Sequence, residues 1–147
     1  MTVVVLAMDG SPDSVAAARR LASRPLLAGP LSVHVAHVSP GLPSTGLSRA
    51  ALDAENRSQA DSAFAAAEAV LPGLPLVRHW LHGDPAAELV RLAETLAADA
   101  IVLGAKGRGA IVSALLGSVV SAVLAQATVP VIVINPRAAQ ARAPAQA

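Results

Sequence analysis

The sequence contains no cysteine, no tyrosine, one tryptophan and one phenylalanine among its 147 residues. Without cysteine the chain forms neither a disulfide framework nor a thiolate metal site, and this composition suits a reducing compartment, so we expect a cytoplasmic location. The scarcity of aromatic side chains leaves little surface for stacking bases, and the formal net charge of +1 provides no broad basic face. We therefore expect no nucleic-acid partner.

Charged residues are also absent from residue 109 to residue 136, a stretch long enough to span a bilayer. The stretch is interrupted by Gly117, Ser118, Gln126 and Pro130, and much of its apolar character comes from alanine, which inserts weakly. Its pattern also changes from a helical period to a continuous apolar run near Pro130. We therefore expect no membrane span. The N-terminus lacks a positively charged leader, so we expect no signal peptide either.

Apolar runs and helical periods alternate along the chain. Continuous runs rich in β-branched residues predict strands buried on both faces, and i, i+3, i+4, i+7 spacing predicts helices between them. The expected strands are residues 2–8, 31–38, 76–82, 100–103 and 130–134, and the expected helices start at residues 12, 49, 85 and 118. Ser11 and Asp84 are suitable N-caps, and each is followed by a proline at the first helical position.

This alternation predicts one α/β domain built on a doubly wound, five-stranded parallel sheet. We expect a flavodoxin-like or Rossmann-like fold with strand order 3-2-1-4-5, spanning residues 1–135, followed by a disordered tail at residues 136–147. In such sheets ligands bind at the carboxyl ends of the strands where the strand order reverses. The first and fourth strands would meet at that point.

A glycine-rich loop follows the fourth strand. Gly104, Gly107 and Gly109 allow the backbone to approach a ligand closely, and Lys106 and Arg108 add positive charge between them. This pattern predicts a phosphate site. The loop is neither a Walker loop, because Lys106 is followed by glycine, nor a complete dinucleotide fingerprint, because the third small residue is missing. For the loop alone, a tight turn without a ligand is the alternative.

Asp9 ends the first strand and would face the glycine loop across the crevice. Its carboxylate could hold a ribose hydroxyl, an adenine amine or a Mg²⁺ ion. The alternative is a simple turn residue at the end of a strand.

Four segments, in the right order, resemble the universal stress protein family over nearly the whole chain. They are residues 5–11 (VLAMDGS), 36–38 (AHV), 82–85 (HGDP) and 101–119, which carries the spacing Gly104-x2-Gly107-x9-Gly117-Ser118. The resemblance implies a flavodoxin-like fold, a homodimer and, through the glycine spacing, the branch of the family that binds ATP.

The resemblance also implies roles for individual residues. Carried over by position, the adenosine part would contact Ala7, Met8, Asp9 and Val38. The ribose and phosphates would pass beside Gly104 and Gly107, and the same nucleotide site would include Leu103, Lys106, Arg108 and Gly109. Backbone N–H groups of Gly117, Ser118 and Val119, with the Ser118 hydroxyl, would bind phosphates. A dimer would form through Val131-Ile132-Val133-Ile134 and through a last helix whose expected outer face, Val120, Ser121, Ala122 and Gln126, lacks the usual charges.

We therefore expect a regulatory or stress-response protein that binds ATP or another adenine nucleotide, with Mg²⁺ held through Asp9 where a metal is present. Hydrolysis would be slow at most, because no general base or activated nucleophile accompanies Asp9. The alternative is a dimeric interaction module of the same fold that binds no nucleotide. An ATP pyrophosphatase or adenylyl transferase would need a conspicuous catalytic loop, which the sequence lacks.

The histidines fall in pairs on two expected strands. His34 and His37 lie on the second strand, and His79 and His82 lie on the third. No carboxylate or cysteine is found at matching spacing, which favours ordinary hydrogen-bonded histidines over a metal site.

Overall fold

The computed structural model describes residues 1–23, 25–43, 48–107 and 116–136. In this part of the chain five strands alternate with four helices. The elements are β1 (Thr2–Ala7), α1 (Pro12–Ser23), β2 (Leu31–Ser39), α2 (Ser48–Val70), β3 (Leu76–His82), α3 (Pro85–Thr95), β4 (Ala100–Gly104), α4 (Ser118–Gln126) and β5 (Val131–Ile134). Every predicted strand and helix is present.

All five strands are parallel and lie in the order β3-β2-β1-β4-β5, which confirms the predicted topology. β1 lies at the centre, where Leu6 pairs with Val35 of β2 on one side and with Val102 of β4 on the other. The strand order reverses between β1 and β4, so the carboxyl ends of these two strands lie side by side at the position expected for a ligand.

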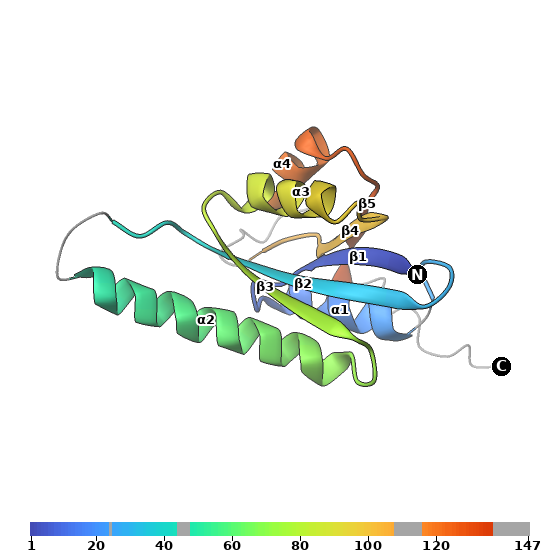
Figure 1. Ribbon diagram of the computed structural model, residues 1–147, viewed down its shortest axis with the longest axis horizontal. Coiled ribbons are helices and arrows are strands. Elements are labelled where there is room, and N and C mark those ends of the chain that lie inside the picture. Colours follow the sequence, from blue (N-terminus) through green and yellow to red (C-terminus); the bar gives the residue numbers. More distant parts are fainter. Residues whose placement is uncertain (24, 44–47, 108–115, 137–147) are drawn as a thin grey trace.

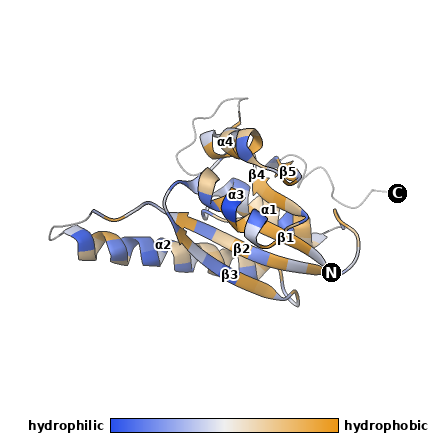
Figure 2. Ribbon diagram, turned by 45° about the horizontal axis from the view of Figure 1, so that its top comes forward, coloured by the Kyte–Doolittle hydropathy of each residue, from blue (hydrophilic) through white to orange (hydrophobic). Residues whose placement is uncertain are grey.

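Helices cover both faces of the sheet (Figure 1). α1 and α2 lie on one face, and α3 and α4 lie on the other. Because side chains alternate along a strand, the core divides in the same way: Leu6 packs with Phe64 of α2, whereas Val5 packs with Leu89 of α3. Figure 2 shows the strands largely orange, while α2 carries blue bands along its length. Coverage on both faces explains why the strands read as continuous apolar runs.

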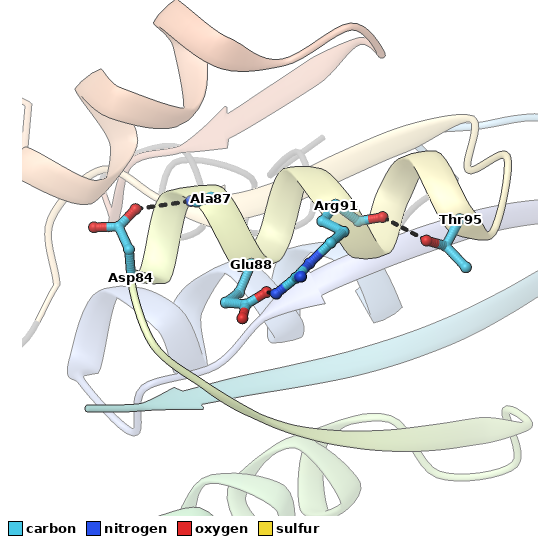
Figure 3. Close-up of polar contacts among 5 residues, drawn as sticks. All are labelled: Asp84, Ala87, Glu88, Arg91 and Thr95. Atoms are coloured by element: carbon cyan, nitrogen blue, oxygen red, sulfur yellow. Dashed lines mark hydrogen bonds and ion pairs between the residues drawn. The ribbon is translucent and has the colours of Figure 1, made fainter. Parts of the chain in front are cut away.

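Two helices start at the caps that the sequence predicts. Ser11 Oγ accepts the backbone N–H of Ser14 at 3.2 Å, and Asp84 Oδ2 accepts that of Ala87 at 2.9 Å. Figure 3 shows the Asp84 carboxylate turned back toward the first turn of α3. Each cap satisfies an N–H group that has no partner within the helix, and so fixes where α1 and α3 leave the carboxyl edge of the sheet.

The stretch without charged residues, 109–136, does not form one long helix in its described part. That part forms α4 and then β5. No helix among the described residues combines the length and the apolar character needed to cross a bilayer. The expected tail lies outside the described residues from residue 137 onward, so its disorder stays a prediction.

The outer face of α4 differs from the expected one. Val120 is buried at 2% exposure and Ala122 is half-buried against the same core, so the expectation that both belong to an outward face is wrong. Ser121, Leu124 and Gln126 are exposed instead. α4 packs on α3 and on β5, and only this placement decides which of its uncharged residues face outward.

Candidate functional site

A cavity of about 140 Å³ opens at the carboxyl ends of β1 and β4. β1, β2, β4 and the starts of α1, α3 and α4 all contribute to its wall. The described residues that line it are Ala7, Met8, Asp9, Ser14, Ala36, Val38, Pro85, Leu89, Leu103, Gly104, Lys106, Gly107, Val119 and Val120. Among them only Asp9 and Lys106 carry a charge, so the cavity is an apolar space bordered by one acidic and one basic residue.

The turn after β1 places Asp9 at the cavity. Gly10 has a φ of 81°, in the left-handed region that favours glycine. Asp9 Oδ1 accepts the backbone N–H of Ser11 at 2.8 Å, which closes the turn. The two interpretations of Asp9 are therefore compatible, because one carboxylate both shapes the turn and lines the cavity.

Two hydrogen bonds hold the backbone of Met8. Its N–H donates to the carbonyl of Ala36 at 2.9 Å, and its carbonyl lies 2.8 Å from His37 Nδ1. A carbonyl only accepts, so His37 Nδ1 carries the proton and donates. His37 is 5% exposed, and its hydrogen bond holds the backbone of Met8, which lines the cavity. This agrees with the interpretation of the histidines as ordinary hydrogen-bonded residues.

Contacts with α1 and with Asp9 position the described part of the glycine loop. A Cβ on Gly104 would lie 2.6 Å from the carbonyl carbon and oxygen of Asp13, so β4 and α1 touch backbone to backbone at this point. The Asp13 carboxylate then accepts the N–H of Lys106 at 3.0 Å. A Cβ on Gly107 would lie 2.8 Å from Asp9 Oδ2. The neighbouring backbone thus requires a glycine at residue 104 whether or not a ligand is bound, whereas Gly107 meets only the end of the Asp9 side chain.

The loop returns to α4 through a second contact. The N–H of Gly117 donates to the carbonyl of Ala105 at 2.8 Å, so in this structure it serves the loop itself. Gly117 is also the N-cap of α4, and it has no side chain to cap the helix. The N–H groups of Ser118 and Val119 have no partner within the helix, because they precede the first helical hydrogen bond, which Ser121 donates. The positive end of the helix dipole lies there too.

The structure brings most of the predicted site residues to one place. Those that line the cavity are Ala7, Met8, Asp9, Val38, Leu103, Gly104, Lys106, Gly107 and Val119. Gly117 and Ser118 lie directly before Val119 in the chain, and Arg108 and Gly109 fall outside the described residues. Whether these positions bind a ligand stays a prediction.

The predicted set lacks several lining residues, namely Ser14, Ala36, Pro85, Leu89 and Val120. Ala36 and Pro85 belong to segments that carry the family resemblance, so a signal for them was present in the sequence. Leu89 and Val120 belong to apolar helix faces, and such a face indicates only that a residue points toward the sheet. The tertiary arrangement shows that these two residues also reach the cavity.

The sequence matches the model of the universal stress protein family over residues 1–135. Among its relatives, the universal stress protein MJ0531 of Methanocaldococcus jannaschii is 33% identical over 139 residues, which cover 90% of this chain and 81% of that protein.

Solved structures share the fold. The protein MJ0577 superposes with a TM-score of 0.78 at 22% identity, covering 91% of this chain and 95% of that one. The universal stress protein of Archaeoglobus fulgidus in complex with dAMP gives a TM-score of 0.65 at 28% identity, with 91% and 97% covered. A universal stress protein in complex with cAMP gives 0.60 at 25% identity, with 92% and 97% covered. The chain therefore belongs to the universal stress protein family.

Proposed function

We propose that the cavity between β1 and β4 binds an adenine nucleotide, and that the protein acts as a nucleotide-dependent regulator in a stress response. The observation that carries this proposal is the convergence of Asp9, the glycine loop and the start of α4 on one apolar cavity. Adenosine has flat apolar faces and polar edges, which suit an apolar wall with a carboxylate at its border. Phosphates suit backbone N–H groups at a helix start and a nearby lysine.

The two relatives solved with dAMP and cAMP support adenine as the base. For this chain we propose ATP, since the loop adds Lys106 beside the start of α4. Mg²⁺ is compatible with the site, because Asp9 supplies an oxygen ligand and the phosphates and water would supply the others. Among the described lining residues the only hydroxyl is that of Ser14, which donates to the carbonyl of Ser11 rather than to a base, so binding rather than rapid turnover is the proposed role. The cysteine-free composition suits a cytoplasmic location.

A charge placed at the start of α4 tests the proposal. Val119→Asp puts a carboxylate on the cavity wall, where it would repel phosphate oxygens. We expect calorimetric titration with ATP and Mg²⁺ to show micromolar binding to wild type and at least a roughly tenfold loss in the variant, which corresponds to about 1.4 kcal/mol. An aspartate in the first turn favours the helix dipole, but Val119 also packs against the core, so thermal unfolding of the variant checks that it folds.

The matched control is Ser121→Asp. It adds the same charge to the same helix, but Ser121 is exposed and does not line the cavity. We expect an affinity within about threefold of wild type, because an exposed charge is screened by solvent and salt. Equal losses in both variants would argue against phosphates at this helix start. Wild type that binds neither ATP nor AMP would favour the alternative, an interaction module with an empty cavity.

The proposed homodimer would use the edge strand β5 of the described sheet and the outer side of α4. β5 is the last strand of the sheet, and three of its four residues, all apolar, are only half-buried. An apolar edge strand is a template for pairing with another chain. On α4, Leu124 is 48% exposed and adds a large apolar side chain to the outer side of this helix.

Leu124→Glu should convert the dimer to a monomer, because it would bury a charge in the contact. Light scattering on a sizing column measures the mass. Leu52→Glu is the control, since Leu52 is 43% exposed on α2, away from β5. Ala122 would be a poor choice, because it packs against its own core. A wild-type monomer, or a Leu124→Glu dimer, would contradict the proposed contact.

A further inference from the structure

Two histidines meet on the sheet outside the cavity. His34 of β2 pairs with Val77 in the ladder, and His79 of β3 pairs with Ala36, so the histidines are offset diagonally on neighbouring strands. Residues that pair in a ladder point to the same face, and so do residues two apart along a strand. Both histidines therefore lie on the face that carries α3 and α4, and both are partly exposed.

Their ring nitrogens are close. His34 Nδ1 lies 2.8 Å from His79 Nε2, and the ring centroids are 5.1 Å apart with an interplanar angle of 30°. Two imidazole nitrogens that each lie about 2.0 Å from one metal ion are about 2.8 Å apart when they subtend a right angle, and about 3.3 Å apart in a tetrahedron. In the metal-free protein the observed separation is that of a hydrogen bond, in which one ring N–H donates to the other ring nitrogen. It is also short enough for both nitrogens to reach one ion at the right angle that Cu²⁺ and Ni²⁺ prefer, once the shared proton is displaced.

One tautomer of each ring leaves the two facing nitrogens for a metal. Ser32 Oγ lies 3.4 Å from His34 Nε2 and accepts its proton in the tautomer that leaves His34 Nδ1 basic. A neutral imidazole is the form that binds metals. His79 would carry its proton on Nδ1 when Nε2 is the ligand.

We propose that His34 and His79 form a binding site for a Cu²⁺ or Ni²⁺ ion, held by His34 Nδ1 and His79 Nε2. The described residues contain no group of three or more histidine, cysteine, aspartate or glutamate side chains suited to a metal. Water therefore takes the remaining coordination positions, and the site stays open to an exchangeable ligand. This inference is independent of nucleotide binding, because neither histidine lines the cavity.

Calorimetric titration of NiCl₂ into the full chain, free of nucleotide and without a polyhistidine tag, tests the site. We expect one Ni²⁺ per chain in wild type and at least a roughly tenfold weaker affinity in His34→Gln and in His79→Gln, each of which removes one ligand. His82→Gln is the matched control. His82 is exposed on the opposite face of β3, where its ring contacts that of Trp80 at a tilt of 48°, and its loss should leave the affinity unchanged.

A second readout identifies the metal ligands directly. Electron paramagnetic resonance of wild type loaded with one equivalent of Cu²⁺ should show coupling to two imidazole nitrogens, and to at most one in either variant. Thermal unfolding of the metal-free variants checks that they fold. Absence of saturable Ni²⁺ binding to wild type, equal affinity in all four proteins, or a Cu²⁺ signal without two nitrogens would overturn the proposal.

Discussion

Replacing Gly104 with alanine should destabilise the protein by about 3 kcal/mol, the upper part of the usual range for overpacking a core. The new Cβ would lie 2.6 Å from the carbonyl carbon and oxygen of Asp13 and 2.9 Å from its Cβ. The backbone of α1 cannot rotate away as a side chain does, so β4 and α1 must move apart. Gly104 is buried and forms part of a fully buried strand, which leaves little space for that movement.

For a domain of this size the loss should lower the midpoint of thermal unfolding by roughly 10 °C, which circular dichroism measures. Gly41→Ala is the control. Gly41 is exposed, its φ lies outside the left-handed region, and a Cβ there would meet nothing within 4 Å. That variant should unfold at the wild-type temperature or slightly above it. If Gly104→Ala unfolds together with wild type, the backbone contact between β4 and α1 is not tight in solution.

Asp9→Asn should weaken adenine-nucleotide binding by about 10-fold to 100-fold, the effect of losing a hydrogen bond to a charged group worth about 1.5–3 kcal/mol. The asparagine oxygen can still accept the N–H of Ser11, so the turn after β1 is kept. The variant therefore removes the charge at the cavity without removing the local structure. Stability should stay within about 0.5 kcal/mol of wild type.

Calorimetry with ATP, 2′-deoxy-ATP and ATP in EDTA identifies what Asp9 contacts. If the carboxylate binds the 2′-hydroxyl, wild type and Asp9→Asn should bind 2′-deoxy-ATP with equal affinity. If the carboxylate binds Mg²⁺, the two proteins should bind ATP with equal affinity in EDTA. Asp99→Asn is the control, because its carboxylate accepts the N–H of Val3 at the opposite edge of the sheet. Equal affinities of Asp9→Asn and wild type for ATP would exclude a direct role for the Asp9 charge.

Local signals determined the elements of this fold. Ser11-Pro12 and Asp84-Pro85 act within one helical turn, and the apolar runs of β1 and β4 reflect burial on both faces, so the sequence alone was enough to place them. The spacing from Gly104 to Ser118 also marked the loop and the helix start that line the cavity, because glycine is required wherever backbones approach closely.

The tertiary structure decided which residues are in contact. Lys106 and Asp13 are 93 residues apart in sequence, and no local pattern reveals that α1 holds the glycine loop. The same is true of Val120, which turned out to be buried, and of His34 and His79, which the pairing of β2 with β3 brings within 2.8 Å. Helical and strand periods report which way a side chain points, whereas the packing of one element on another decides its neighbours, and a binding site is made of neighbours.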